Sequence, residues 1–485
     1  MEKHDIFPPR GSDFGSGGVA PITDQELIPF PPSNTFHHDP HTEEDSLCIQ
    51  GTLGDLFPVT SSSSSLDASL SVEDLVRIAA SKFVGSHWNY AMPSIVADIT
   101  LSDEQSESVE LTGLLLEACQ SVDIRRFDAA RTLLEQCHWR SSPVGNPIQR
   151  LVFYYSQALR TRIERETGRI VAGEVAKEQS FEFYKAVMNP SVQSAEFHRR
   201  MPFSQVAQFA GMQVIVEHVE GARRIHVVDL ALRNGQQWTI LMQALAARSK
   251  RRRVRFFKIT AVATLGKHAI EQTGERLVSF AESLGVPCNF EVVVVPDLAQ
   301  LSRDHIRVEA GYVVAVYADY MVNTLTKPPD RLDSLIRVVQ SLNPRVMVVG
   351  EVEGNMNSPV FVDRFVESLF YASAFFDCME ECMGRDESMR KYGEAMLFGE
   401  SSKIILANEG RERIVRNMKV DVWRTYFRRM GMVEKEMSRS SVYHADLVAK
   451  KLPCWAPCTV KKDGKGLVIG WKGTQINSVT AWGFK

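Results

Sequence analysis

The spacing of hydrophobic positions changes sharply near residue 230. Residues 225–230 form a short, nearly all-apolar run rich in β-branched side chains, which predicts a strand buried on both faces. Residues 233–235 (Arg-Asn-Gly) are typical of a turn. Apolar side chains then recur every three or four positions, which predicts a helix with one buried face. We therefore expect a strand, a tight loop and a helix, with Asp229 at the carboxyl end of the strand. The apolar face of the helix consists of Trp238, Leu241, Met242 and Leu245.

The same alternation of apolar runs and helical patterns continues to about residue 350. It predicts an α/β fold with a doubly wound, mostly parallel sheet of methyltransferase-like (Rossmann-type) topology. Turn signals at 463–464 and 472–473 predict antiparallel strands at the C-terminus. The expected parallel strands are residues 225–230, 254–262, 290–295, 312–317 and 345–350, and the expected antiparallel strands are residues 458–461, 466–471 and 476–482.

Composition and periodicity divide the chain into three parts. Residues 1–70 are rich in Pro, Gly, His and Ser and lack periodicity, which predicts a disordered arm. Residues 71–108 read as a short helical and linker segment. From residue 109 to 485 we expect one domain, with an N-terminal helical cap over about 109–190 and an α/β core over about 191–485.

Composition limits the partners and the cellular compartment that we expect for the protein. The 485 residues carry a net charge of −3, so any contact with DNA must be local. No apolar run approaches the roughly 20 residues that span a membrane, and the first residues lack the apolar region of a signal peptide. Eight cysteines in so long a chain predict no disulfide framework and a reducing, intracellular compartment.

The loop after Asp229 lies where nucleotide and S-adenosylmethionine sites begin. Cofactor loops of that class usually place glycines at the positions that are here Ala231, Arg233 and Gly235. The side chains of Ala231 and Arg233 would block the close approach of a cofactor to the backbone. No acidic residue follows the second strand near Ala263 to bind a ribose. The sequence therefore predicts the fold without its cofactor, and a methyltransferase with an unusual loop is the alternative function.

Two further sets of residues suggest chemistry but are better explained as structural. His226 lies in the middle of a strand without an evident acid–base partner, which favours a hydrogen-bonded core histidine over a catalytic one. Cys378, Cys382, Cys454 and Cys458 form two pairs that could offer four thiolates to zinc, but C-x-x-x-C is looser than C-x-x-C. We predict no catalytic, cofactor or metal site.

Two surfaces are candidates for binding. Residues 111–115 form an LxxLL string that can dock in a partner's groove, although the same spacing also serves the core face of a helical bundle. A basic cluster at residues 250–253 suits nuclear import or phosphate contact, or a solvated helix end. The candidate partner-binding residues are Leu111, Leu114, Leu115, Leu133 and Leu134, and the basic residues are Lys250, Arg251, Arg252 and Arg253.

These motifs, in this order, resemble those of the GRAS family of plant transcriptional regulators, in a Scarecrow-like form without a DELLA motif. Residues 355–377 are similar to the family's PFYRE region, and residues from Glu409 resemble its RVER segment, although Val415 stands where that motif has Glu. The VHIID-like core is Ile225, His226, Val227, Val228 and Asp229, and the SAW-like terminus has the tryptophans Trp471 and Trp482.

The resemblance implies a nuclear, non-enzymatic regulator with a helical cap over a methyltransferase-like core. It implies association, as homo- or heterodimers, with other GRAS proteins and with DNA-binding transcription factors through leucine-rich helical regions. It leaves direct contact with DNA open.

Overall fold

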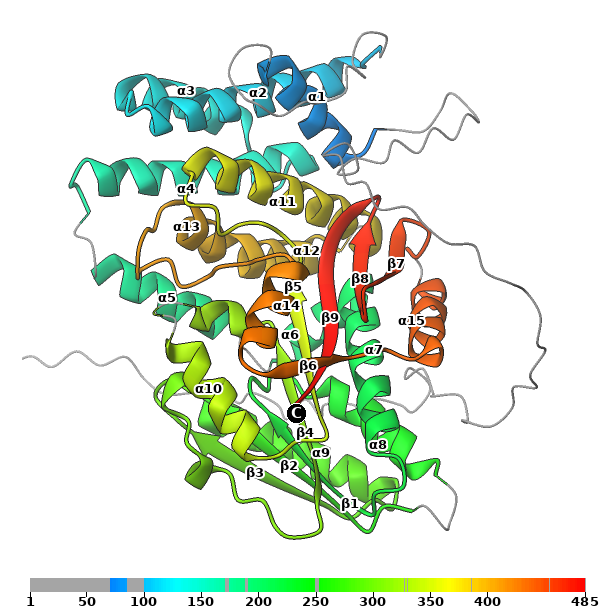
Figure 1. The fold of residues 1–485 in the computed structure, drawn as a ribbon. Coiled ribbons are helices and arrows are strands. Elements are labelled where there is room, and N and C mark those ends of the chain that lie inside the picture. Colours follow the sequence, from blue (N-terminus) through cyan, green and yellow to red (C-terminus); the bar gives the residue numbers. More distant parts are fainter. Residues whose placement is uncertain are drawn as a thin grey trace, which may run out of the picture.

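The carboxyl ends of five parallel strands face a layer of helices in this molecule (Figure 1). The computed structural model describes residues 70–84, 100–170, 174–187, 191–248, 253–326, 328, 330–384, 386–452 and 454–484. The arm expected over residues 1–70 therefore lies almost entirely outside the described residues. No helix in the described part of the chain is long and apolar enough to cross a membrane.

Within the described residues the sheet has nine strands, in the order β3-β2-β1-β4-β5-β9-β8-β7, with β6 pairing with β9. Strands β1 to β5 are parallel, and β9 runs antiparallel to β5. The predicted fold class is confirmed, whereas the four residues of β6 carry too weak an alternation to be predicted. The strands are β1 (Arg224–Asp229), β2 (Phe256–Ala263), β3 (Cys288–Val294), β4 (Val313–Asp319), β5 (Val346–Val352), β6 (Met432–Lys435), β7 (Cys458–Asp463), β8 (Gly466–Trp471) and β9 (Thr474–Phe484).

Strand β1 lies in the middle of the parallel part of the sheet. Val227 is flanked by Ile259 of β2 and Ala315 of β4, and all three side chains are buried. Val227 joins the apolar cluster on one face of the sheet, and Val228 joins the cluster on the other. A strand buried on both faces explains the nearly continuous apolar run in the sequence.

Helices cover both faces of the sheet, as expected for alternating strands and helices. Helices α7, α8, α9 and α15 pack on the face that Val227 joins, and α10 and α14 pack on the other. The helices of this part of the chain, including α6, which packs on α7, are α6 (Val192–Arg200), α7 (Pro202–His218), α8 (Gln236–Ala246), α9 (Lys267–Ser283), α10 (Asp330–Ser341), α14 (Val420–Arg429) and α15 (Arg439–Lys451).

The helical cap combines segments from both halves of the chain. We predicted it from N-terminal residues alone, but α11 packs against α1, α2 and α4. Helix α11 is apolar on most of its circumference, which suits a helix buried on several sides. A buried ion pair between Arg150 of α4 and Glu394 of α12 (2.8 Å) also joins the two segments. The cap helices are α1 (Val72–Val84), α2 (Asp103–Asp123), α3 (Phe127–Arg140), α4 (Pro147–Glu166), α5 (Glu174–Val187), α11 (Phe361–Met383), α12 (Glu387–Glu394) and α13 (Glu400–Leu406).

Helix α2 begins several residues before the apolar pattern that we used to predict it. Ser102 caps the helix by accepting a hydrogen bond from the Gln105 backbone N–H (3.2 Å), and the Gln105 side chain accepts one from the Ser102 backbone (2.9 Å). This reciprocal capping box fixes the start of the helix within a polar first turn. Apolar periodicity alone cannot detect such a turn.

Candidate functional site

The carboxyl edge of the parallel strands is the place where α/β sheets usually bind ligands, at the point where the strand order reverses. Here that point lies between β1 and β4. Asp229 ends β1, and its Oδ1 accepts a hydrogen bond from the Ala231 backbone N–H (3.0 Å). Its Oδ2 accepts bonds from Gln237 Nε2 (3.0 Å) and Trp238 Nε1 (2.8 Å) of α8. Burial raises the pKa of Asp229 to about 6. All the hydrogen bonds described for Asp229 therefore go to the loop or to the start of α8.

Arg233 lies in the loop at a position where a cofactor-binding chain usually has glycine. Its Nη2 donates to the backbone oxygen of Asp319 (2.8 Å) and to Asp319 Oδ2 (3.0 Å). The guanidinium also lies over the ring of Tyr320, 5.1 Å from its centroid. The loop after β1 is therefore fastened to the end of β4 by a side chain.

The remaining strand ends do not supply the groups that the methyltransferase cofactor needs. A cavity of about 260 Å³ lies over them, lined by Ala231, Thr264 and Met321 among others. Thr264 follows β2, where a ribose-binding acid would lie. Asp297, which follows β3, is paired with Arg331 (2.7 Å). The residues of this edge therefore do not fit S-adenosylmethionine.

His226 lies away from this edge, in the middle of β1. It is buried, and its Nε2 is 2.8 Å from Thr260 Oγ1 of β2. Burial lowers the pKa of His226 to about 3, and Lys258 adds to the effect. A neutral, hydrogen-bonded histidine of this kind packs in the core. The neighbouring motif residues Ile225, Val227 and Val228 are also buried.

The two tryptophans of the SAW-like terminus are both buried. Trp471 Nε1 donates to Asp377 Oδ2 of α11 (2.7 Å). Trp482 Nε1 donates to Thr480 Oγ1 (2.9 Å), and its ring packs 5.0 Å from that of Phe427. These contacts join the C-terminal strands to α11 and α14.

The candidate partner-binding leucines are mostly internal. Leu111, Leu115 and Leu134 are buried in the core of the chain, so in this conformation they cannot form a contact surface. Leu114 and Leu133 are partly buried and pack against the same core. The structure thus corrects the position that we expected for the surface, because the leucine spacing serves the packing of α2 and α3.

The basic cluster is described only in part. Lys250, Arg251 and Arg252 lie outside the described residues, while Arg253 is exposed and donates to the Gly285 backbone oxygen (3.2 Å). Arg253 lies just before β2, at the edge of the sheet opposite the cap.

A second stretch of basic residues, between Arg411 and Arg429, combines buried and exposed side chains. Arg416 donates to Asn357 Oδ1 (2.9 Å), and Arg424 pairs with Glu434 (3.0 Å). Both arginines are buried. Arg416 and Arg424 therefore serve internal packing, whereas Arg411, Arg428 and Arg429 of the same stretch are exposed.

The two cysteine pairs lie close together, but two of the four cysteines form a disulfide and do not offer thiolates to zinc. Cys382 and Cys454 form a disulfide, although the sequence predicted no disulfide framework. Cys378 Sγ lies 3.7 Å from Cys382 Sγ, and Cys458 is a free thiol. Across the described residues, no group of three or more His, Cys, Asp or Glu side chains could hold a metal ion.

Sequence reasoning missed an exposed tryptophan of the cap. Trp139, near the end of α3, is 85% exposed. Its neighbours in the sequence, His138, Arg140 and Ser141, are polar, and an isolated Trp among polar residues is the signal that could have identified it.

The strand order and the blocked loop define a protein with the methyltransferase-like α/β fold but without its cofactor loop. The chain belongs to the GRAS domain family, whose model matches residues 111–483. It is 25% identical over 400 residues to DELLA protein 1 of Medicago truncatula, covering 79% of this chain and 64% of that protein. It is 28% identical over 392 residues to Scarecrow-like protein 9 of Arabidopsis thaliana, covering 78% of this chain and 52% of that protein. The chain thus spans less than two thirds of the length of these relatives.

The fold is also that of a solved relative. The crystal structure of SCL7 of Oryza sativa matches with a TM-score of 0.65 and 26% identity, covering 77% of this chain and 99% of that one. The predicted family resemblance is therefore confirmed.

Proposed function

We propose that this chain is a transcriptional regulator that acts in the nucleus by associating with other proteins. The observation that carries the proposal is the family match across residues 111–483, the part that contains almost the whole described fold. The fastening of the loop after β1 by Arg233 supports a regulatory role over methyl transfer. The partners that we propose are other GRAS proteins and DNA-binding transcription factors.

The cap provides a specific candidate for the partner surface. Trp139 is almost fully exposed, and Val144 in the turn that follows α3 is more than half exposed. Large exposed aromatic side chains are frequent among the residues that dominate binding at interfaces. We place the partner contact at Trp139 rather than at the buried leucines.

A matched pair of variants tests this placement. Trp139→Ala should reduce co-precipitation of GRAS partners at least tenfold while leaving the melting temperature unchanged, because the side chain packs little within the chain. Leu115→Ala should lower the free energy of unfolding by roughly 2–5 kcal/mol, because it leaves a cavity in the core. Full partner binding by a folded Trp139→Ala variant would remove Trp139 from the proposal.

The cluster at residues 250–253 is our candidate for nuclear entry or for contact with nucleic acid phosphates. Its basic charge is dense, and the described residue Arg253 is exposed at the edge of the sheet. Lys250, Arg251, Arg252 and Arg253 changed together to Gln should shift the protein towards the cytoplasm or weaken its retention on DNA. A folded variant with unchanged location and retention would leave the cluster as a solvated surface.

The methyltransferase alternative has its own test. Calorimetry with S-adenosylmethionine should show no saturable binding, because Ala231 and Arg233 carry side chains where the cofactor needs bare backbone. Micromolar binding at one site would overturn the non-enzymatic proposal.

A further inference from the structure

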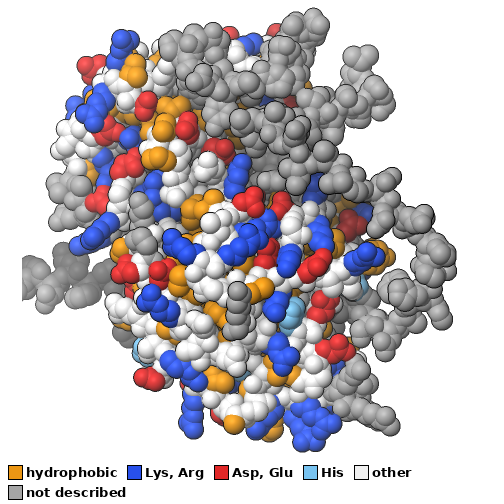
Figure 2. All heavy atoms as spheres, in the orientation of Figure 1, with side chains coloured by type: hydrophobic (Ala, Val, Ile, Leu, Met, Phe, Trp, Pro, Cys, Tyr) orange, Lys and Arg blue, Asp and Glu red, His pale blue; other side chains and the backbone are white. Residues whose placement is uncertain are grey.

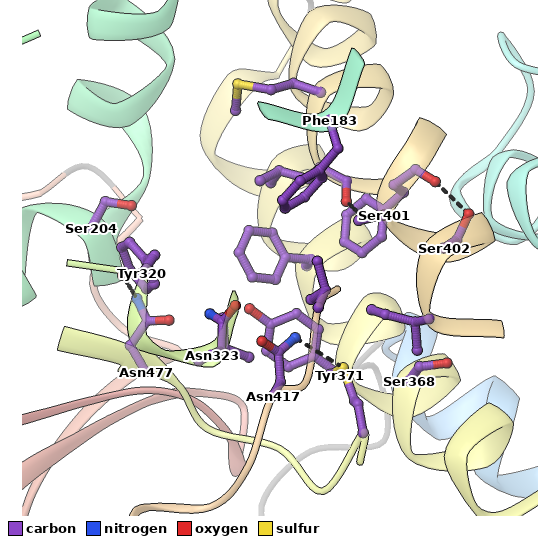
Figure 3. A pocket seen from close by; sticks show the side chains of 18 of the residues that line it. Phe183, Ser204, Tyr320, Asn323, Ser368, Tyr371, Ser401, Ser402, Asn417 and Asn477 are labelled. Atoms are coloured by element: carbon purple, nitrogen blue, oxygen red, sulfur yellow. Dashed lines mark hydrogen bonds between the residues drawn. The ribbon is translucent and has the colours of Figure 1, made fainter. Parts of the chain in front are cut away.

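A cavity of about 130 Å³ lies between the cap and the carboxyl edge of the sheet. Its walls come from cap helices including α4, α5, α11 and α13 and from residues that follow β4 and β5 (Figure 3). An engineered cavity of about 150 Å³ in another protein takes up benzene. The space is therefore large enough for a ligand with a ring, and not only for water.

Most of the cavity wall is aromatic or flexible and apolar. The rings of Phe375 and Phe398 are 5.7 Å apart, and Phe183, Phe197 and Met396 complete this side. Aromatic side chains favour edge-to-face and offset contacts with another ring. A methionine adapts its shape to what it packs against. This side of the cavity suits a flat apolar ring.

Two polar side chains on the wall lack strong partners. Asn417 is buried, and its Oδ1 has no hydrogen-bond partner in the described part of the chain. Its Nδ2 contacts Met356 Sδ at 3.4 Å, and a thioether is only a weak acceptor. The structure also gives the Tyr371 hydroxyl no partner among the described residues. Figure 3 shows both polar ends turned towards the same part of the cavity.

These two groups match one kind of ligand atom. An unpaired amide oxygen needs a donor, and a tyrosine hydroxyl can donate to an acceptor. A ligand hydroxyl satisfies both, because it can donate to Asn417 Oδ1 and accept from Tyr371.

The charges near the cavity disfavour an ionised ligand. Arg233 is the cation on the wall, and its guanidinium is already paired with Asp319 (3.0 Å). Burial and the nearby Arg233 lower the pKa of His198 to about 3, so this histidine is neutral at physiological pH. An added carboxylate would lose its hydration without gaining an unpaired cation.

We propose that this cavity is a binding site for an uncharged small molecule that carries an apolar ring and a hydroxyl group. The ring packs among the phenylalanines of the cap, and the hydroxyl bonds to Asn417 and Tyr371. Since the cavity is walled by both the cap and the sheet, a bound molecule stabilises their contact. This site is separate from the proposed partner surface at Trp139.

Three single-ring probes test the chemistry with the full chain: toluene, p-cresol and 4-methylbenzoate. Binding is followed by ligand-observed NMR titration at neutral pH. We expect p-cresol to bind at least tenfold more tightly than toluene, because toluene lacks the hydroxyl. We also expect p-cresol to bind at least tenfold more tightly than 4-methylbenzoate, because 4-methylbenzoate is charged. If neither p-cresol nor toluene binds saturably, the proposal is overturned.

Variants assign the binding to this cavity. Asn417→Leu should reduce p-cresol affinity to that of toluene, and Ser401→Phe should weaken both probes at least tenfold by filling space on the wall. Tyr371→Phe keeps the ring and removes only the hydroxyl, so it tests the same bond in a variant of nearly unchanged shape. Asn289→Leu on the exposed edge of β3 is the matched control and should bind as the parent does. Equal p-cresol affinity in the parent and in folded Asn417→Leu and Tyr371→Phe variants would contradict the assignment.

Discussion

Arg233 joins the loop after β1 to the end of β4 through contacts that are almost fully buried. Its side chain and that of Asp319 are 11% and 10% exposed. Removing one partner of a buried ion pair leaves an uncompensated charge, which is more unfavourable than losing the attraction alone. The side chain that stands where cofactor-binding chains usually have glycine is therefore also a stabilising element of the fold.

Replacing this arginine should reduce stability markedly. Arg233→Met should lower the free energy of unfolding by about 3 kcal/mol, as expected for a broken buried pair. The exposed pair of Arg199 and Glu196 in α6 gives the control, and Arg199→Met should change it by less than about 1 kcal/mol. Urea unfolding measures both, and equal effects of the two substitutions would contradict the role given to Arg233.

Glu351, at the end of β5, predicts a dependence of stability on pH. Burial raises the pKa of Glu351 to about 7, although it accepts bonds from the Val322 backbone N–H (2.8 Å) and Asn323 Nδ2 (2.7 Å). Since this pKa lies above the ordinary value of 4.5, its contribution to stability is full below that value. The contribution is then lost as the pH rises through about 7.

Glu351→Gln isolates this effect, because it removes the titration and keeps an oxygen for Val322. Buried His198 and His226 have lowered pKa values and act in the opposite direction below about pH 6.5. The informative quantity is therefore the difference in unfolding free energy between parent and variant. That difference should shift in favour of the variant between about pH 5 and pH 8, and a constant difference across urea unfolding curves would refute the assignment.

At the scale of elements, α1 is attached to the rest of the molecule although it precedes the region that the family model matches. Its first backbone N–H, at Val72, donates to Asp377 Oδ1 of α11 (3.1 Å), and Glu73 accepts a bond from Thr474. Val76 of α1 is buried in the core. Helix α1 therefore packs as part of the cap.

Asp377 is the central acceptor of this contact, since it also binds Trp471 Nε1 (2.7 Å) and Lys472 Nζ (2.8 Å). Asp377→Ala should lower the free energy of unfolding by about 3 kcal/mol or more, because buried donors lose their partner. It should also speed hydrogen exchange in α1. Asp128→Ala, at an exposed site on α3, is the control, and exchange in α1 that is equal in the two variants would contradict the docking role.

At the scale of the whole molecule, the centre of the sheet could be predicted because β1, β4 and β5 are buried on both faces and are therefore almost continuously apolar, as in residues 225–230. The cap could be predicted only in part. Helix α11 lies far along the chain from α4, and the pairing of Arg150 with Glu394 depends on three-dimensional contact that periodicity does not encode.

The features of the candidate site could likewise be predicted only in part from the sequence. The blocked loop was readable from Ala231 and Arg233, since the argument needed only residue types at fixed positions. The leucines misled because one spacing serves both a core and an interface, and only burial distinguishes the two. The cavity beside Asn417 is lined by segments that lie far apart in the sequence, so no local sequence pattern predicts it.

The central claim is that the chain regulates transcription through partner proteins, and chromatin occupancy in plant nuclei tests it most directly. The measurement compares the full chain in cells with and without its co-precipitating DNA-binding factors. We predict occupancy at discrete promoters that falls at least tenfold when those factors are depleted. Absence of the folded chain from chromatin in both cases, or occupancy unchanged by the depletion, would contradict the claim.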